Sequence, residues 1–348
     1  MKGLVLGRPA RIAAVLAAAA ALLASAATAS ATPTVHASKK ADSLVIGLPG
    51  IPPVFLGVRP YVALQLGYYK KWGVDVTLKG FTTGTDAVRA VQAGQIDAAW
   101  SPTPFALTLI SKGVPLVGIE GMDKVDWLVG VNSSSIKTCS DLKGQNIGVD
   151  SIGGARYAAL QAMLSKCNLT IQDVKPIVLP GNTAVAAMLA GQIHASVLHL
   201  DDLAEASKQG EPVRQLLTLT QVDPFQSYDM LVATKDTVAA KRAALVKMIA
   251  ADIAATKYMN NPKALDKIAQ VATISGHDPA VSKVALKQYL ALKWWPADRS
   301  GLGIASITRT IFENVKLGNI SNGNPPKWKD VVDTSLWKQA FAMVSKKK

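Results

Sequence analysis

The sequence predicts a two-lobed α/β fold in which two mainly parallel sheets are joined by a two-strand hinge. Residues 87–98 (AVRAVQAGQIDA) and 184–195 (AVAAMLAGQIHA) are identical at eight of twelve positions, at a constant offset of 97. Around each copy, strand-like runs alternate with helical ones, which is typical of βαβ units. Two further β-prone runs, 127–131 and 228–233, flank the second copy. The chain would therefore leave the first lobe, build the second and return.

The first 31 residues have the pattern of a secretory signal peptide. Lys2, Arg8 and Arg11 precede an apolar run, and Ala29-Ser30-Ala31 provides the small residues of a cleavage site after Ala31. The run is shorter than the roughly 20 residues that an uncleaved anchor helix needs, which is the alternative interpretation. We therefore expect an exported, periplasmic protein from which residues 1–31 have been removed.

The composition excludes some classes of protein. A chain that is 49% hydrophobic and 18% charged is not disordered. Without residues 1–31 the net charge falls from +14 to +11, and the basic residues are scattered, with no stripe interleaved with aromatic residues. We therefore expect a basic surface that attracts anions toward a cleft, and no nucleic-acid partner.

Each copy of the repeat contains the signals of strand, helix and strand. In the first copy, residues 44–48 form a strand, Thr85 can cap a helix that ends at Gly94, and residues 95–100 enter the sheet. In the second copy, residues 145–149 form a strand, Gly191 ends the corresponding helix, and residues 193–198 form the next strand.

Residues 236–348 are predicted to be mostly helical, because apolar residues recur there every three to four positions. The expected helices cover 236–259, 262–272, 279–292, 302–317 and 328–344. They would pack on the lobe to which the chain returns. The first lobe is therefore predicted to contain residues 42–127 and 232–348, and the second residues 128–231.

Three segments resemble signature stretches of the nitrate/sulfonate/taurine-type solute-binding proteins of ABC importers, which are related to binders of thiamine-pyrimidine precursors. They are LGYYKKWGVDVTL (66–78), GTDAVRAVQAGQIDAAWSPTP (84–104) and SIKTCSDLKGQNIGV (135–149). The resemblance implies a type II periplasmic-binding-protein fold that closes on a small solute and docks on a membrane permease. We expect a monomer that binds no cofactor and no metal.

Ligands of open α/β sheets gather at the carboxyl ends of the strands, against helix N-termini. In the first lobe this points to Phe55 after the strand at 44–48, and to Trp100, Ser101 and Thr103 at the end of the segment 95–100 that enters the sheet. The two hydroxyls beside free backbone amides could hold an oxyanion. The alternatives are a core position for Phe55, an inter-lobe position for Trp100 and ordinary helix capping by Ser101 and Thr103. We expect Arg59 to be a solvated surface residue, and a position facing the cleft is the alternative.

In the second lobe the turn 150–157 provides candidate anion contacts. The paired Gly153 and Gly154 allow close backbone approach at the start of a helix, Ser151 offers a hydroxyl, and Arg156 could form a forked ion pair. A surface position is the alternative for Arg156.

The last turn contains His199 and Asp201, where sulfonate binders often have an aromatic residue and an acid. This departure leaves the solute open, and a structural histidine is the alternative for His199. The first candidate solute is a small organic anion such as a sulfonate, taurine or nitrate. The alternative is a pyrimidine thiamine precursor or an aromatic carboxylate.

We do not expect an enzyme. The four histidines include His194 and His199, which lie five apart on an expected strand and so point to opposite faces. No HExxH, GxSxG or GxxxxGK[ST] pattern occurs. A module that presents its ligand to a sensor would use the same cleft, and only neighbouring permease and ATPase genes would distinguish it from an importer component.

Cys139 and Cys167 are the two cysteines of the chain, and both should lie at the same edge of the second lobe. Export to an oxidising compartment favours a disulfide between them. Two free buried thiols are the alternative.

Overall fold

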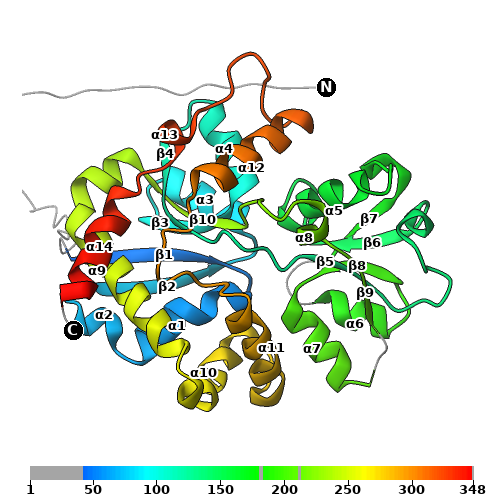
Figure 1. The fold of residues 1–348 in the computed structure, drawn as a ribbon, viewed down its shortest axis with the longest axis horizontal. Helices are drawn as coiled ribbons and strands as arrows, with labels where there is room; N and C mark the ends of the chain where they lie inside the picture. The colour runs from blue at the N-terminus through cyan, green and yellow to red at the C-terminus, as the bar shows by residue number, and fades with distance from the viewer. Residues whose placement is uncertain (1–41, 180–182, 211–212, 347–348) are drawn as a thin grey trace, which may run out of the picture. The chain divides into compact units, whose positions relative to one another are not determined.

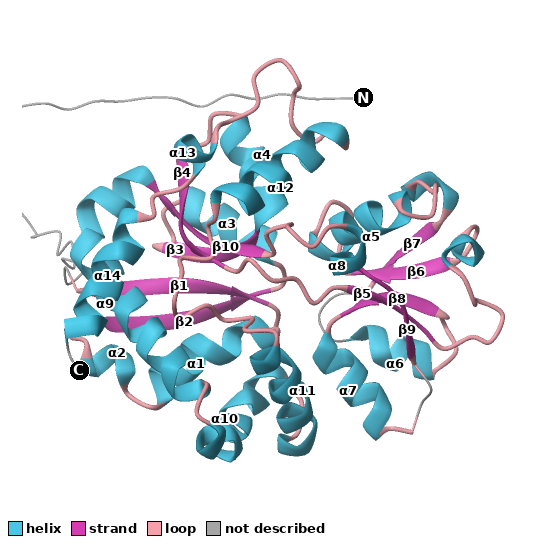
Figure 2. Cartoon of the chain, in the orientation of Figure 1, coloured by secondary structure: helices cyan, strands magenta, loops and turns pink. Residues whose placement is uncertain are grey.

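The computed structural model describes residues 42–179, 183–210 and 213–346. The predicted signal peptide, residues 1–31, falls outside the described residues. Within them the chain forms two five-stranded sheets, each covered by helices (Figures 1 and 2).

The first sheet has the strand order β2-β1-β3-β10-β4. β1 pairs in parallel with β2 and β3, whereas β10 lies antiparallel between β3 and β4. The strands are β1 (Ser43–Pro49), β2 (Asp75–Phe81), β3 (Ala98–Pro102), β4 (Leu116–Gly121) and β10 (Asp229–Thr234). Residues 229–231, which the sequence assigned to the second lobe, therefore belong to the first sheet, because the returning strand begins at Asp229.

The second sheet has the equivalent order, β7-β6-β8-β5-β9. β6 pairs in parallel with β7 and β8, and β5 lies antiparallel between β8 and β9. The strands are β5 (Leu128–Val131), β6 (Asn146–Val149), β7 (Lys175–Val178), β8 (Ala195–Leu198) and β9 (Arg214–Thr218). In each sheet the fourth strand in this order, β10 or β5, is antiparallel to both of its neighbours. Both sheets are therefore mixed, and they share one topology.

Ten of the described α-helices belong to the first lobe. They are α1 (Val58–Gln65), α2 (Tyr68–Lys71), α3 (Gly84–Gln92), α4 (Thr103–Ser111), α9 (Lys235–Met259), α10 (Leu265–Ala272), α11 (Pro279–Ala291), α12 (Ile304–Lys316), α13 (Trp328–Val331) and α14 (Ser335–Lys346). The remaining four described α-helices lie between β5 and β10 in the chain. They are α5 (Ala155–Ser165), α6 (Thr183–Leu189), α7 (Leu200–Lys208) and α8 (Leu219–Val222).

Short 3₁₀ helices complete the described elements. They are η1 (Phe55–Gly57), η2 (Cys139–Leu142), η3 (Ile171–Asp173), η4 (Pro262–Ala264) and η5 (Thr273–Ser275).

Two local predictions were wrong. The side chain of Thr83, not that of Thr85, caps α3 by accepting a hydrogen bond from the Asp86 amide at 3.1 Å. The predicted helix 328–344 is two helices, because Val332 leaves the helix to form a β-bridge with Gly118. Gly94 and Gly191 do follow their helices with φ of 67° and 68°, a conformation that glycine adopts without steric cost.

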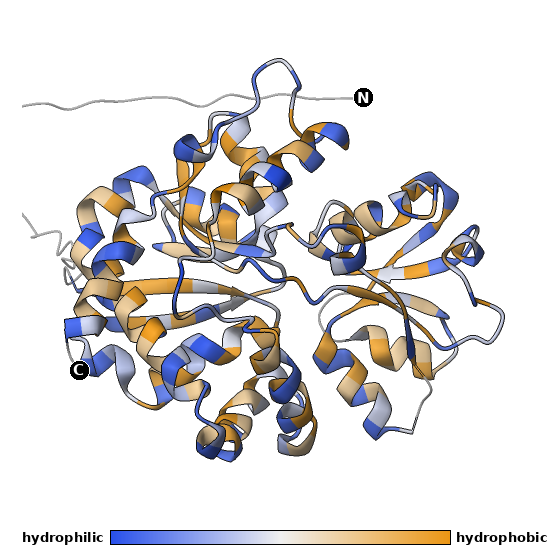
Figure 3. Ribbon diagram, viewed as in Figure 1, coloured by the Kyte–Doolittle hydropathy of each residue, from blue (hydrophilic) through white to orange (hydrophobic). Residues whose placement is uncertain are grey.

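The core lies between each sheet and its helices. Every residue of β3, β4, β5 and β8 is buried, so these strands are covered on both faces. Figure 3 shows the hydrophobic stretches along the strands and on the helix faces turned toward them.

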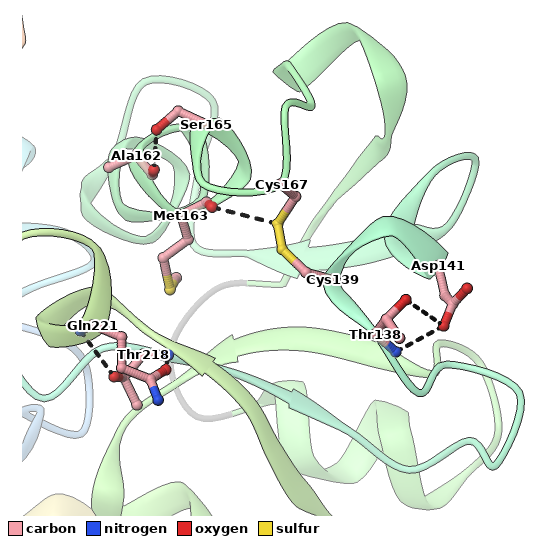
Figure 4. The surroundings of a disulfide bond; sticks show 9 residues. All are labelled: Thr138, Cys139, Asp141, Ala162, Met163, Ser165, Cys167, Thr218 and Gln221. Carbon is pink, nitrogen blue, oxygen red and sulfur yellow. Dashed lines mark hydrogen bonds between the residues drawn. A yellow bond between two sulfur atoms is a disulfide. The ribbon is translucent and has the colours of Figure 1, made fainter.

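The described chain passes between the sheets twice, through residues 122–127 and 219–228, and the second passage includes α8. In the second lobe a disulfide joins Cys139 at the start of η2 to Cys167 beyond α5, with their Cα atoms 5.6 Å apart (Figure 4). These are the two cysteines that the sequence paired.

Candidate functional site

The ends of strands from both sheets line one cavity. It holds about 470 Å³ of atom-free space, part of which is open to solvent. Trp127 and Tyr228, at the ends of the two passages between the sheets, lie in its wall. The other lining residues are Pro49, Gly50, Val54, Thr82, Thr83, Gly84, Pro102 and Asp229 from the first lobe, and Asp150, Ala155, Arg156 and His199 from the second.

Two neighbouring cavities share lining residues with this one. One of about 310 Å³ shares Pro102, Trp127, Ala155 and Tyr228 with it. Another of about 750 Å³ shares Pro102, and there the turn at Gly153 and Gly154 is opposite α4 and α12 residues of the first lobe. We refer to the three together as the cleft.

Three rings form an aromatic wall of the cleft: Trp127, His199 and Tyr228. The ring centroids of Trp127 and His199 are 4.6 Å apart, and those of Trp127 and Tyr228 are 5.5 Å apart. His199 and Tyr228 meet edge to face at 6.1 Å. The faces of Trp and Tyr rings can contact an organic ring or a cation.

The guanidinium of Arg156 lies in the cleft wall but is already paired. It donates to the carbonyl oxygen of Val197 at 3.1 Å and to a carboxylate oxygen of Asp202 at 3.3 Å, and the residue is 3% exposed. Burial alone would lower its pKa, but the charges of Asp202, Asp150 and Asp201 together outweigh this effect and raise it. The positive charge is therefore balanced within the second lobe.

Asp150 occupies the N-terminus of α5. Its carboxylate accepts hydrogen bonds from the amides of Ser151, Ala155 and Arg156 at 2.8, 3.0 and 3.1 Å. These are amides that would otherwise be available to an anion at the start of the helix. A carboxylate of the chain itself therefore stands where the sequence predicted the anionic end of the solute.

Asp229 begins β10 and is 3% exposed, yet its side chain has no hydrogen-bond partner among the described residues. Burial, strengthened by the charges of Asp126 and Asp150 and opposed by His199, raises the pKa of Asp229 to about 8. The side chain is thus an acid held largely in its neutral form at neutral pH, at the wall of the cleft.

The lobes also meet through α7 and the segment that begins α11, a region we call the α7–α11 contact (Figure 1). His277 lies 3.0 Å from a carboxylate oxygen of Asp201 and 3.0 Å from one of Glu205. The hydroxyl of Tyr289 donates to Asp201 and to Asp126, at 2.6 Å each. Asp126 in turn contacts Nδ1 of His199 at 2.9 Å, which links this contact to the aromatic wall.

The α7–α11 contact is charged. Burial alone would lower the pKa of His277, but the hydrogen bonds and charges of Asp201 and Glu205 raise it to about 9. Burial would raise the pKa of Asp201, but the hydrogen bond and charge of His277, with the charge of His199, lower it to about 2. Lys208 of α7 also pairs with Asp278.

Several residues predicted to contact the solute lie elsewhere. Phe55 stacks on Tyr289 with centroids 4.9 Å apart, in the aromatic core of the first lobe. Trp100 is 1% exposed and lies beneath the guanidinium of Arg59, which is 5.1 Å from its ring centroid. Arg59 itself is buried and 2.9 Å from Glu120, so the expectation of a solvated surface arginine was wrong.

The hydroxyls are occupied as well. Ser101 is fully buried and donates to the carbonyl oxygen of Pro102, and the Thr103 hydroxyl lies 3.0 Å from that of Ser227. Asp201 faces His277, away from the cavity lining. Ser151 lies in the turn beside the cleft without lining it.

The structure brings Gly153, Gly154, Arg156 and His199 to the cleft, as lining residues. Sequence reasoning missed Trp127, Tyr228, Asp150 and Asp229 as lining residues. Trp127 and Tyr228 begin the two β-prone runs that were identified as crossings, and the aromatic residue at the start of each was the available signal.

No group of three or more His, Cys, Asp or Glu side chains in the described part of the chain is placed to hold a metal ion. No helix within residues 42–179, 183–210 and 213–346 is both long and apolar enough to cross a membrane.

Comparison with known sequences gives one family. The profile of the family described as NMT1/THI5 like matches residues 55–264, more than half of the chain. A candidate binding protein of Brucella abortus (strain 2308) is 27% identical over 191 residues. That match covers 54% of this chain and 59% of the relative, so the chain spans little more than half the length of the curated relatives it matches.

Solved structures share the fold. The nitrate-binding protein NrtA of Synechocystis PCC 6803 superposes with a TM-score of 0.72 at 14% identity, over 87% of this chain and 89% of that one. The alkanesulfonate-binding protein SsuA of Xanthomonas axonopodis pv. citri, bound to MOPS, superposes with a TM-score of 0.66 at 19% identity, over 84% of this chain and 99% of that one. A cysteine-to-serine mutant of DszB in complex with biphenyl-2-sulfinic acid superposes with a TM-score of 0.62 at 13% identity, over 87% of this chain and 99% of that one. At these identities the likeness establishes the type II periplasmic-binding-protein fold alone.

Proposed function

The chain belongs to the NMT1/THI5-like family, and from this membership we propose that it is the exported solute-binding component of an ABC importer. It would capture a small solute in the cleft between its lobes and deliver it to a membrane permease, acting as a monomer. The signal peptide expected at residues 1–31 supports a periplasmic location for this activity.

The observation that carries the proposal is the position of the cleft. Strand ends of both sheets meet there, and the two chain passages border it through Trp127 and Tyr228. A solute held between two lobes that are joined by such passages stabilises the closed arrangement, because it contacts both lobes at once only there.

Capture rather than catalysis is the mechanism we propose. The two cysteines are joined to each other, so the described chain offers no free thiol nucleophile. Gly153, Gly154, Arg156 and His199 are proposed to contact the solute from the second lobe, and Tyr228 and Asp229 from the first.

For the solute, the sequence favoured a small organic anion, with a pyrimidine precursor or an aromatic carboxylate as the alternative. The aromatic wall is the observation that favours a ring-bearing solute as a second candidate, because Trp127 and Tyr228 can cover the face of a ring.

A thermal-shift screen of the mature protein tests the function. Sulfonates, nitrate, carboxylates, pyrimidines and organic amines are added singly, and hits are titrated by calorimetry. A binder takes up one equivalent of solute, and a solute at 100 times its Kd adds about 2.7 kcal/mol to the stability. Mass spectrometry of the recovered solute must find it unchanged. Turnover, or the absence of a hit in every class, contradicts the proposal.

A further inference from the structure

The charges around the cleft differ from those of an anion site. The basic groups within it or beside it are each matched by an acid: Arg156 by Asp202, His199 by Asp126, and His277 by Asp201 and Glu205. Asp150 and Asp229 line the cavity in addition, and neither forms an ion pair within the described residues. The ionisable groups of the cleft that have no partner of opposite charge are therefore acids.

The helix N-termini at the cleft carry acids as well. Asp150 accepts from the first amides of α5, and Asp202 accepts from the amide of His199 at the start of α7 at 2.9 Å. At the start of α3, Asp86 accepts a hydrogen bond from the hydroxyl of Thr83 at 2.8 Å. Of these three acids Asp150 lines the cavity, so an anionic solute at the start of α5 would meet its carboxylate.

The carboxyl group of Asp229 is a hydrogen-bond acceptor in the cleft that no described residue uses. It is 3% exposed, it lines the cavity, and its side chain is not hydrogen-bonded within the described residues. An unpaired buried carboxyl group costs free energy that a donor from outside the chain can recover. Trp127 and Tyr228 line the same cavity and offer faces that attract cations.

We propose that the solute is an organic cation with a flat nitrogen-bearing head, such as an amidinium, whose N–H groups donate to the carboxylate of Asp229 while its face contacts Trp127 and Tyr228 of the aromatic wall. This inference rests on the proposed function as a solute-binding protein. Asp229 is then the residue that selects cations over anions of the same shape.

Binding would be linked to proton release. The raised pKa of Asp229 leaves this group largely protonated in the empty cavity at pH 7. A bound cation favours the carboxylate, so the acid proton passes to solvent and up to one proton is released for each solute bound. The groups that act on Asp229 are Asp126, Asp150 and His199, and Arg156 lines the same cavity. Cation affinity should therefore rise with pH up to about 8.

A matched pair of probes tests the inference, because benzamidine and benzoate have similar shapes and opposite charges. We expect benzamidine to raise the Tm of the wild-type protein more than benzoate or benzenesulfonate does. Calorimetry in buffers of different ionisation enthalpy should detect the released proton at pH 7. Asp229→Asn should weaken benzamidine binding at least tenfold and abolish proton release, whereas the exposed control Asp75→Asn should change neither.

The failures of the two proposals are distinguishable. Stronger stabilisation by benzoate or benzenesulfonate, equal stabilisation by both charges, or a neutral hit alone overturns the cation inference and leaves the binding function intact. A cation that binds Asp229→Asn as tightly as wild type also overturns it. No stabilisation by these probes or by any class in the wider screen overturns the binding function as well.

Discussion

At the scale of single residues, the buried acid Asp229 gives the chain a pH dependence that is independent of any solute. Its pKa is about 8 in the folded protein against an ordinary value of 3.8, so the folded state binds more protons than the unfolded one between these pH values. Stability from this group therefore falls as pH rises from about 4 to 8.

Asp229→Asn should remove this dependence, because the amide does not ionise. Relative to wild type, the variant should gain up to about 1.4 kcal/mol per pH unit between pH 4 and 8. Urea unfolding at pH 5, 6.5 and 8 measures the difference. The exposed Asp75→Asn is the control, and equal pH profiles for wild type and Asp229→Asn would show that the carboxyl group is solvated.

The residues of the site were only partly predictable. The glycine pair at 153–154 and the turn at His199 could be placed because they follow strands of a recognisable repeat. Whether a polar side chain there is free depends on partners distant in sequence: Arg156 faces Asp202, and Thr103 faces Ser227. A short stretch of sequence does not show which distant residue a side chain will meet. Free hydroxyls were therefore expected at Ser101 and Thr103, whereas both form hydrogen bonds within the protein.

At the scale of elements, the α7–α11 contact is the charged connection between the lobes. His277 has a pKa of about 9 when folded and 6.5 ordinarily. Its stabilising effect is therefore complete below about pH 6.5 and is lost as pH rises through 9.

His277→Gln should cost about 3 kcal/mol at pH 6, because it leaves Asp201 and Glu205 without their cation. The deficit should shrink toward pH 9.5, where wild type has lost the charge too. Thermal unfolding across this range measures it, with the exposed His194→Gln as the matched control. A deficit that does not change with pH would mean that His277 is neutral in the folded protein.

The disulfide is a second element-scale feature. It closes a loop of 28 residues, so replacing both cysteines with serine should cost roughly 3–4 kcal/mol. The shift in denaturant midpoint for Cys139→Ser/Cys167→Ser, compared with wild type without reductant, tests this. Two titratable thiols in the denatured, unreduced wild-type protein would contradict the bond itself.

Helices were predicted with greater success than their ends. The expected helix 236–259 corresponds to α9, and 279–292 to α11. Both were predictable because apolar residues spaced three to four apart form one face of a helix, and that face packs on the core. The break between α13 and α14 was missed because Val332 leaves the helix to pair with β4, a contact across more than 200 residues of chain.

At the scale of the whole molecule, the duplication identified in the sequence predicted the fold. Two copies of one strand–helix pattern, and two crossings between them, are enough to specify two equivalent sheets. The solute was not predictable in the same way, because Trp127 and Tyr228 of the cleft wall come from the crossings, which lie outside the repeat.

Closure is the property of the whole molecule that a solute should change. A saturating solute from the screen should reduce the radius of gyration in small-angle X-ray scattering and alter tryptophan fluorescence, because Trp127 lies in the cleft wall. Trp127→Phe should keep the contraction and lose most of the fluorescence change. An unchanged radius with full occupancy would mean that binding does not move the lobes.

The insertion of β10 between β3 and β4 also constrains the order of folding. Every strand of the second sheet lies within residues 128–218, whereas the first sheet lacks an inner strand until residue 234 is present. In the proposed export the chain emerges N-terminus first, so β3 and β4 stay without their shared sheet partner β10 while the second sheet is completed. Pulse-labelled hydrogen exchange should therefore find the amides of β6 and β8 protected before those of β3 and β4.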